Sequence, residues 1–440
     1  MIRRQRYGGE SEKYISELDK NQWFSLKELK EIQINRLKDM IKHAYNNVPY
    51  YQDLFKSLGI LPEHIQTIKD LERMPVIDKY TVKKHSRQFV ATNMNRRRLI
   101  PVHTGGTTGT PLTIYLTKNA MRRLFAWSEA RVKNWTGVKS GDKLASFLHS
   151  GEVLVPLNQK KPPFWRWNKA YNQLLFSVFH MSEDNLKYYV KKFNGFRPQI
   201  VQGYVTAVYT FARYILNHQL QIFSPKGVLL SSETLFAHQR REIEAAFHSK
   251  VYNSYSGGEC VAFITECERG RLHLSPEYGV IELRKIRDGD DRYEIIGTNL
   301  FNFAMPLIRY KTGDIVTLSQ EKKCLCGREL PLVKSVEGRS DAMVVTPEGH
   351  WVSPSSLAMA FQTARNIKES QIIQLSRNKI IAKIVKEEKF SKRDLNYILH
   401  RLNERVGKNM TIEIEFVDHI EKTKAGKFRF VISEISSDEI

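Results

Sequence analysis

The stretch His103-Thr104-Gly105-Gly106-Thr107-Thr108-Gly109-Thr110-Pro111 decides how this chain is organised. Runs typical of β-strands flank it at residues 99–102 and 112–116, which predicts a strand, a loop and a returning strand. Glycines let backbone N–H groups turn toward one anion, and the threonine hydroxyls add further donors. The loop therefore suits a polyphosphate, although no Gly-Lys-Ser/Thr closes it as in a Walker A motif. On these residues alone a polar hairpin turn is the alternative.

The composition describes a soluble globular protein with material for two to three domains. The chain has 440 residues, of which 41% are hydrophobic and 11% aromatic. No apolar run approaches the ~20 residues of a membrane-spanning helix. The basic N-terminus lacks a following apolar stretch, so no signal peptide is predicted. The four cysteines do not make a disulfide framework, and the expected location is a reducing cytoplasm.

The formal net charge of +22 leaves nucleic acid, an anionic membrane surface and anionic small molecules open as partners. The basic residues are spread along the chain without an RNP aromatic motif or zinc-finger spacing, so no nucleic acid partner is expected. Residues 158–171 are predicted to form a basic and aromatic loop. That loop either folds on the core beside the substrate or contacts anionic lipid. Its characteristic residues are Lys160, Lys161, Phe164, Trp165, Arg166, Trp167 and Lys169.

Alternating strand and helix patterns predict an α/β core with a largely parallel sheet. Residues 1–90 have helical periodicity, and residues 119–135 form a further helix that Thr117 caps. The expected strands are 143–148, 199–204, 227–233 and 251–255, with helices ending at 216 and covering 238–247. Ligands of such sheets lie beyond the carboxyl ends of the strands. Polar residues stand at these ends, among them Glu233 and the run 255–259.

The last third of the chain has a different pattern. Residues 277–320 predict antiparallel strands at 279–283, 292–298 and 306–314. From near Ser340 a small α+β unit is expected. Its strands are predicted at 342–345, 372–375, 379–385 and 411–417, and its basic helix at 391–406.

Six motifs in order resemble those of the adenylate-forming (acyl-CoA ligase) superfamily. The resemblance covers nearly the whole chain and is strongest to the phenylacetate–CoA ligase and CapK-like group, which includes coenzyme F390 synthetase-like proteins. The motifs are residues 44–51, the loop 104–111, Tyr255-Ser256-Gly257-Gly258-Glu259, Arg309-Tyr310-Lys311-Thr312-Gly313-Asp314, Gly338-Arg339-Ser340-Asp341 and Lys422-Thr423-Lys424-Ala425-Gly426-Lys427.

The resemblance implies a large multi-subdomain N-terminal domain, residues 1–339, and a small mobile C-terminal domain, residues 340–440. It implies ATP-dependent activation of an aryl or fatty acid as acyl-AMP, release of pyrophosphate and transfer to the thiol of CoA. It also suggests a link to capsule or surface polysaccharide synthesis. The alternatives are an adenylyltransferase that places AMP on a hydroxyl, or acyl transfer to an acceptor other than CoA. The oligomeric state stays open.

The same resemblance assigns roles to individual residues. Lys427 is the catalytic lysine, Glu259 holds Mg²⁺, and His149 lies near the acyl carboxylate. A structural histidine is the alternative for His149, and ordinary surface charges are the alternative for the lysine and for Asp314. In the lysine loop Glu421 stands where relatives have proline. Asp341 is the hinge, and Gly203 and Tyr204 line the acyl pocket. The expected ATP-binding residues are Thr104, Gly105, Gly106, Thr107, Thr108, Gly109, Ser232, Glu233, Tyr255, Ser256, Asp314 and Arg339.

The cysteines suggest a structural zinc site. Cys267 and His273 precede the pair Cys324 and Cys326, and three thiolates with an imidazole make a closed tetrahedral Zn²⁺ set. The Cys-x-Cys spacing is shorter than the usual two-residue gap, but some relatives in the resembled group carry a similar set. Free cysteines in a reducing compartment are the alternative, and Cys260 is expected to be free.

Overall fold

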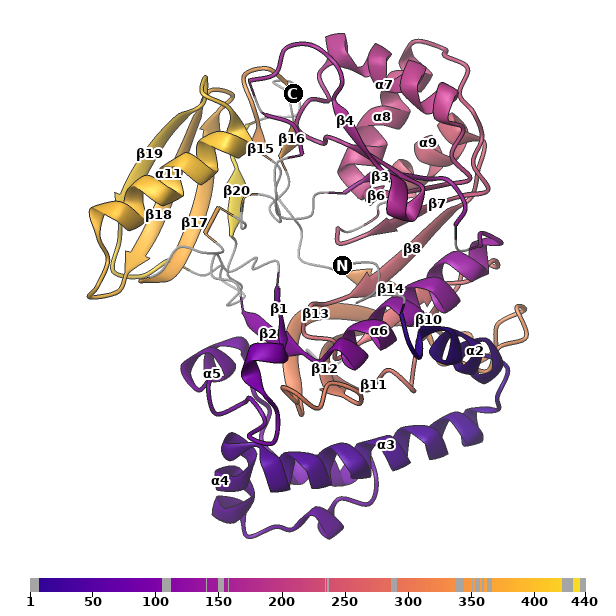
Figure 1. Ribbon diagram of the computed structural model, residues 1–440, viewed down its shortest axis with the longest axis vertical. Helices are drawn as coiled ribbons and strands as arrows, with labels where there is room; N and C mark the ends of the chain where they lie inside the picture. The colour runs from indigo at the N-terminus through magenta and orange to yellow at the C-terminus, as the bar shows by residue number, and fades with distance from the viewer. Residues whose placement is uncertain are drawn as a thin grey trace. The chain divides into compact units, whose positions relative to one another are not determined.

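The computed structural model in Figure 1 describes residues 8–104, 112–139, 141–148, 154–156, 158–233, 235, 237–285, 291–337, 344–349, 351–352, 357, 360–361, 366–421 and 430–435. The chain forms two compact units. Unit 1 comprises Met1–Thr104, Leu112–Ser140 and Tyr252–Gly338, and unit 2 comprises Gly105–Pro111, Gly141–Val251 and Arg339–Ile440. Within the described ranges no helix is both long and apolar enough to cross a membrane.

Polar side chains cap the starts of α3 (Leu26–Asn47), α5 (Lys79–Lys84) and α6 (Lys118–Trp127) in unit 1. Ser25 and Glu28 form a capping box at the start of α3, and Thr117 accepts a hydrogen bond from the backbone N–H of Ala120 at the start of α6, as predicted. Beyond Trp127 the helical segment continues as a π-helix and a 3₁₀ turn. The helices are α2 (Ser11–Asn21), α3 (Leu26–Asn47), α4 (Pro49–Leu58), α5 (Lys79–Lys84) and α6 (Lys118–Trp127).

Unit 1 contains an antiparallel hairpin and an antiparallel sheet. The hairpin pairs β1 (Ile100–His103) with β2 (Thr113–Leu116), which confirms the predicted strand–loop–strand. The sheet follows the order β11-β12-β13-β14-β10-β9-β8. Its strands are β8 (Val251–Ser256), β9 (Phe263–Glu266), β10 (Leu272–Leu274), β11 (Gly279–Lys285), β12 (Arg292–Asn299), β13 (Tyr310–Leu318) and β14 (Leu332–Glu337).

The prediction of a strand at 306–314 was wrong by four residues at its start, because β13 begins at Tyr310. Arg309 has a positive φ of 55°, and its backbone N–H donates to the side-chain hydroxyl of Thr298 at 2.9 Å instead of to a backbone carbonyl. Its guanidinium bonds the Glu282 carboxylate at 2.7 Å. These contacts break the extended run that the apolar pattern of residues 306–308 suggested.

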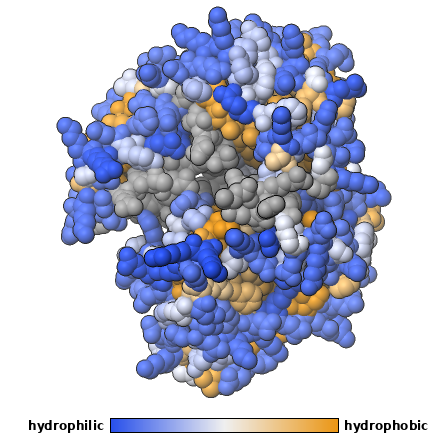
Figure 2. All heavy atoms as spheres, viewed as in Figure 1, coloured by the Kyte–Doolittle hydropathy of each residue, from blue (hydrophilic) through white to orange (hydrophobic). Residues whose placement is uncertain are grey.

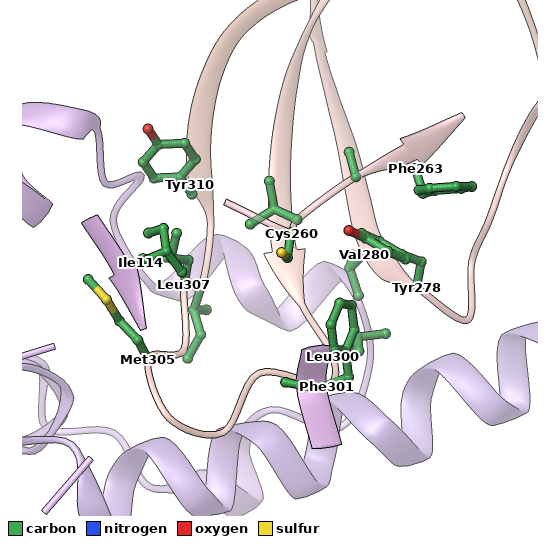
Figure 3. Close-up of a cluster of buried hydrophobic side chains, with 14 of the residues drawn as sticks. Ile114, Cys260, Phe263, Tyr278, Val280, Leu300, Phe301, Met305, Leu307 and Tyr310 are labelled. Atoms are coloured by element: carbon green, nitrogen blue, oxygen red, sulfur yellow. The ribbon is translucent and has the colours of Figure 1, made fainter. Parts of the chain in front are cut away.

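The core of unit 1 lies between the sheet, the hairpin and the helices. Figure 3 shows side chains from β2, β11 and the segments beside the sheet, with Cys260 next to Tyr278 and Val280. Cys260 is fully buried, and burial raises the pKa of its thiol to about 12. The thiol is therefore neutral and packs as a small apolar side chain, as expected for a free cysteine.

Unit 2 contains the predicted parallel sheet, in the order β7-β6-β3-β5-β4 with β4 antiparallel at its edge. Helices pack on it around a stack of aromatic rings, in which Phe147 and Phe176 lie 4.8 Å apart. The elements are β3 (Leu144–Phe147), β4 (Trp165–Asn168), β5 (Gln173–Phe176), α7 (Glu183–Phe196), β6 (Ile200–Tyr204), α8 (Val205–Asn217), β7 (Gly227–Ser231) and α9 (Ala237–Phe247).

The prediction that residues 158–171 form a loop was wrong for the part that contains β4. Trp165 to Asn168 pair residue by residue with β5, from Trp165↔Phe176 to Asn168↔Gln173. Charged and aromatic residues alternate here on an edge strand that keeps one side in solvent. The alternation covers only four residues, it follows a segment rich in lysine and proline, and both Arg166 and Trp167 are exposed, so this part of the sequence resembles a loop.

The C-terminal residues of unit 2 form sheets of their own. The larger follows the order β19-β18-β17-β20, with α11 capped by Ser391 and Asp394. The elements are β15 (Val344–Val345), β16 (Trp351–Val352), β17 (Ile367–Ser376), β18 (Lys379–Lys386), α11 (Lys392–Val406), β19 (Thr411–Phe416) and β20 (Val431–Ser433). The predicted α+β pattern is confirmed. The domain boundary at 339/340 lies outside the described residues and stays a prediction.

Candidate functional site

The predicted phosphate loop is held at its base by a closed hairpin. The Thr104 N–H donates to Leu112 O at 2.9 Å, and the Leu112 N–H donates to the Thr104 hydroxyl oxygen at 3.1 Å. Thr104 is buried, and its side chain ties together the ends of the two hairpin strands. The other expected residues of the loop, Gly105, Gly106, Thr107, Thr108 and Gly109, lie outside the described residues.

The tyrosine-to-glutamate motif reaches the base of this loop from β8. Tyr255 and Ser256 end the strand, and a turn follows in which the Cys260 N–H donates to Gly257 O at 3.1 Å. A Cβ on Gly258 would lie 3.2 Å from Cγ2 of Thr104. The lack of a side chain at Gly258 therefore lets the turn pack against the loop base. Two motifs that are far apart in the sequence meet at this point.

Asp314 joins the same place from β13. The buried Tyr255 hydroxyl donates to Oδ2 of Asp314 at 2.7 Å, and the Asp314 N–H donates to the Thr312 hydroxyl at 3.1 Å. Burial, and then the Asp314 charge, raise the pKa of the Tyr255 phenol well above its usual value. Tyr255 therefore keeps its proton and orients the Asp314 carboxylate as a hydrogen-bond acceptor.

Glu259 is the carboxylate nearest the loop base in the tyrosine-to-glutamate motif. The Tyr310 hydroxyl donates to its Oε1 at 3.3 Å, and a Cβ on Gly257 would lie 2.5 Å from its Oε2. The carboxylate thus folds back over the glycine turn. Carboxylate oxygens are ligands that Mg²⁺ prefers, usually together with phosphates and water. The roles of Tyr310 and Thr312 were missed in the sequence, although both lie inside a motif that was recognised.

In unit 2 the expected pocket residues follow the carboxyl ends of parallel strands. Gly203 and Tyr204 end β6, Tyr204 pairs with Ser231 of β7, and Ser232 and Glu233 come directly after β7. A Cβ on Gly203 would lie 2.4 Å from Cγ2 of Val208, so the position is closely packed and cannot take a side chain without a shift. Ser232 has a positive φ of 71°, which turns the chain sharply at the strand end.

Four further expected residues cannot be placed. His149, Arg339, Asp341 and Lys427 lie outside the described residues. Their catalytic, nucleotide-binding and hinge roles stay predictions.

The cysteine and histidine residues of the predicted zinc site form one cluster in unit 1. The donor atoms of Cys267, His273, Cys324 and Cys326 all lie within 4.8 Å of one another. Sγ of Cys267 is 3.7 Å from Sγ of Cys324, and Sγ of Cys326 is 3.5 Å from Nε2 of His273. Tetrahedral zinc with usual bond lengths sets S–S pairs about 3.8 Å and S–N pairs about 3.6 Å apart. The separations fit a tetrahedral metal and exclude a disulfide.

The residues around the cluster determine the burial, hydrogen bonding and protonation of its donor atoms. His273 is buried, and its Nδ1 lies 3.3 Å from Leu330 O, so Nδ1 carries the proton. Nε2 then has the lone pair that can bind a metal. Burial lowers the His273 pKa to about 4 and raises the Cys324 pKa to about 12. The N–H groups of Arg269 and Cys326 point at Sγ of Cys267 and Cys324. Buried thiolates need such donors and a metal to offset their desolvation.

Comparisons with known proteins give the class first. Solved structures of 2-hydroxyisobutyryl-CoA ligase share the fold. The complex with 2-HIB-AMP and CoA has a TM-score of 0.61 at 17% identity, covering 94% of this chain and 91% of that chain. The complex with R3-HIB-AMP has a TM-score of 0.59 at 19% identity, covering 94% and 91%. The fold is that of the adenylate-forming ligases.

Sequence similarity then gives the family. Protein CapK of Staphylococcus aureus is 33% identical over 411 residues, which is 93% of this chain and 90% of the relative. A phenylacetate-coenzyme A ligase of Thermus thermophilus is 26% identical over 329 residues, 72% of each chain. The family model described as "CapK C-terminal domain" matches residues 344–434. The chain belongs to the CapK family, within the group that contains the phenylacetate-coenzyme A ligases, as the motifs predicted.

Proposed function

We propose that the protein is an AMP-forming carboxylate–CoA ligase. The observation that carries the proposal is the hydrogen bond between Tyr255 and Asp314 beside the turn that packs on Thr104. It joins the ribose, adenine and phosphate motifs of an adenylate-forming ligase at one place in unit 1. The similarity to phenylacetate-coenzyme A ligases supports the same activity.

The first step activates the acid. A carboxylate oxygen attacks the α-phosphorus of ATP, a new P–O bond forms, and the bond to the departing pyrophosphate breaks. Asp314, oriented by Tyr255, accepts hydrogen bonds from the ribose hydroxyls, and the glycine-rich loop holds the β- and γ-phosphates. Lys427 supplies a positive charge to the carboxylate and the α-phosphate as negative charge gathers there. Glu259 holds Mg²⁺, which neutralises phosphate charge when it is bound.

The second step transfers the acyl group. The sulfur of CoA attacks the acyl carbon of the adenylate, AMP leaves with the electron pair of the C–O bond, and the thiol proton passes to solvent. His149 is assigned a place beside the acyl carboxylate in this scheme. Gly203 and Tyr204 line the acyl pocket, with Ser232 and Glu233 beyond the next strand end and Arg339 and Asp341 at the domain junction. A role in capsule or surface polysaccharide synthesis stays a prediction.

We also propose that the cysteine–histidine cluster binds structural Zn²⁺. Cys267, His273, Cys324 and Cys326 would hold the ion, and four protein ligands would make the site closed and structural. Its supports are the 3.7 Å and 3.5 Å donor separations and the burial of the set. The ion would tie the segment after β9 to the segment before β14. Elemental analysis of purified protein tests this assignment, and well under one zinc per chain would contradict it.

The decisive experiment incubates the protein with MgATP, CoA and a panel of aryl and aliphatic acids. Pyrophosphate release and product masses are measured in the same reactions. An acid-dependent release together with an acyl-CoA mass is expected. A matched reaction without CoA should stop at the adenylate and release at most about one pyrophosphate per chain.

The other outcomes discriminate the alternatives. Pyrophosphate release with AMP attached to a hydroxyl compound would support an adenylyltransferase and contradict the ligase. Pyrophosphate release without any acyl-CoA product would indicate an acyl acceptor other than CoA. No release with any acid would overturn adenylate formation itself.

A further inference from the structure

A basic and aromatic surface lies on β4 and α7 of unit 2. Residues 158–197 contain eight Lys and Arg against two Asp and Glu, a formal charge of +6 in 40 residues. The chain as a whole carries +22 in 440 residues. The charge density of this segment is therefore about three times the average, and neither the ligase chemistry nor the metal cluster uses it.

The exposed aromatic residues of this surface are paired with lysines. Nζ of Lys169 lies 5.6 Å from the ring centre of Trp167, and Nζ of Lys187 lies 5.4 Å from that of Tyr188. Trp167 is 60% exposed and Tyr188 is 36% exposed. Each pair presents an apolar body at the surface beside an ammonium group.

A third pair ties the two elements together. Nζ of Lys192 lies 5.8 Å from the ring centre of Trp165, so a residue of α7 covers a residue of β4. The rings of Phe164 and Tyr188 also meet, at 6.3 Å. Trp165 and Trp167 stand two residues apart on the strand and share one face. The pairs thus belong to one continuous surface, which we call the lysine–aromatic face and define as Lys160, Lys161, Trp165, Trp167, Lys169, Lys187, Tyr188, Lys191 and Lys192.

The position of β4 leaves this face open. β4 is the last strand in the order of its sheet, and Lys160 and Lys161 are exposed in the segment before it. The turn that carries them is held by Gln159, whose amide donates to Lys161 O at 2.8 Å and to Pro163 O at 3.0 Å. In Figure 2 hydrophilic residues predominate around β4 and α7, with paler residues of intermediate hydropathy among them. The charged groups therefore reach solvent from fixed positions.

Two other uses of such a surface fit less well. Lysines on an edge strand protect it from pairing with another strand, but that role does not need an exposed tryptophan beside them. Single-stranded nucleic acid stacks its bases on open aromatic faces. Here lysine ammonium groups lie over the ring faces of Trp165, Trp167 and Tyr188. A membrane interface does not need open ring faces. There the rings lie at the level of the lipid headgroups, and the lysines beside them are directed to the lipid phosphates.

We propose that the lysine–aromatic face binds the surface of an anionic lipid bilayer and holds the protein there as a peripheral protein. The lysines attract the anionic headgroups, and Trp167 and Tyr188 insert at the boundary between headgroups and acyl chains. This inference goes beyond the ligase activity and does not depend on it. Attraction by lysines falls with added salt, whereas insertion of the rings does not.

The test uses the full-length protein and sedimentation with phosphatidylcholine vesicles, with and without phosphatidylglycerol. The protein is expected to pellet with the anionic vesicles and to be released in part by salt. Lys160→Gln with Lys161→Gln should weaken partitioning by about tenfold or more, because each lysine near an anionic surface contributes roughly a fivefold factor. Trp167→Ser should also weaken partitioning to the vesicles and should leave the salt dependence of binding unchanged.

The matched control is Lys27→Gln with Lys30→Gln, which removes the same charge from exposed positions of α3 in unit 1. It should keep most of the binding. Equal pelleting with neutral and anionic vesicles, or equal losses in the control and in the Lys160 and Lys161 variant, would overturn the proposal. Displacement from vesicles by single-stranded RNA at equal affinity would indicate a nucleic acid surface instead. Near-ultraviolet circular dichroism shows that each variant is folded.

Discussion

The cysteine–histidine cluster and the nucleotide corner both lie in unit 1, yet they are built in opposite ways. The corner is defined by Thr104, Tyr255, Glu259, Tyr310 and Asp314. The cluster has all of its donors on described residues, and its donor atoms face one another within 4.8 Å. In the corner, side chains hydrogen-bond in pairs, Tyr255 to Asp314 and Tyr310 to Glu259.

This difference predicts that the cluster contributes to the stability of the fold, whereas the corner contributes to substrate binding and catalysis. A closed donor set can only stabilise the folded state, because it has no open position for a substrate. An open set of oriented polar groups can bind a changing substrate, and its energy appears in binding and rate. Variants of the cluster should therefore unfold the protein, and variants of the corner should disable it while it stays folded.

The largest effect is expected for Cys267→Ser. Loss of one ligand from a buried, charged set should lower the free energy of unfolding by about 3–5 kcal/mol. Urea unfolding of zinc-loaded protein measures the change, and elemental analysis should show loss of the metal. Cys260→Ala is the control, because Cys260 lies in the apolar core apart from the cluster. Full zinc content in the Cys267 variant would refute the assignment.

Lys427→Ala should produce the next largest effect. Removal of one charge that stabilises the transition state should lower the rate of adenylate formation by about 10²–10³-fold. Acid-dependent pyrophosphate release measures this rate, and the urea midpoint should not move. Lys424→Ala, three residues earlier in the same motif, is the matched control and should retain most of the rate. An unaltered rate in the first variant would remove Lys427 from the mechanism.

Asp314→Ala should act on nucleotide binding. Hydrogen bonds to a charged group contribute about 1.5–3 kcal/mol, so the affinity for ATP should fall roughly 10- to 100-fold. Isothermal titration with MgATP gives the affinity. Asp291→Ala removes an exposed carboxylate beside the same sheet and should leave the affinity as it is. If both variants bind ATP like the unmodified protein, the ribose assignment is wrong.

Tyr255→Phe should give the smallest effect. The ring stays, and the hydrogen bond from its hydroxyl to Asp314 is lost, which is worth about 0.5–1.5 kcal/mol or a few-fold in ATP affinity. A double-mutant cycle with Asp314→Ala tests whether Tyr255 acts through the aspartate. The two effects should not add, because the hydroxyl has nothing to orient once the carboxylate is gone. Full additivity would show that Tyr255 contacts ATP independently.

Much of the fold could be predicted from the sequence because its signals are local. Thr117 and Ser25 mark helix starts by capping, and the strands around the parallel sheet are short apolar runs between turns. The two corrections fall where local signals fail. β4 is an edge strand of only four residues with exposed charged and aromatic side chains, and the start of β13 is shifted by the positive φ of Arg309 and its bonds to other segments.

The candidate site was predicted in its residue types and only in part in its contacts. Tyr255, Glu259 and Asp314 were recognised as parts of motifs. The partners of Glu259 and Asp314, the Tyr310 and Tyr255 hydroxyls, became visible only in three dimensions. Nothing in a linear spacing shows which of several neighbouring polar residues will face inward, because that depends on strand register and on the turn that follows.

By itself the sequence determined the order of elements, the family and the residues of the proposed metal site, since caps, apolar periods and motifs act over a few residues. The tertiary structure alone decided which donors meet. Cys267 and Cys324 are 57 residues apart, and Tyr255 and Asp314 are 59 apart, yet each pair comes within contact distance. Such distances along the chain are closed by the packing of a whole sheet, which is a property of all its strands together.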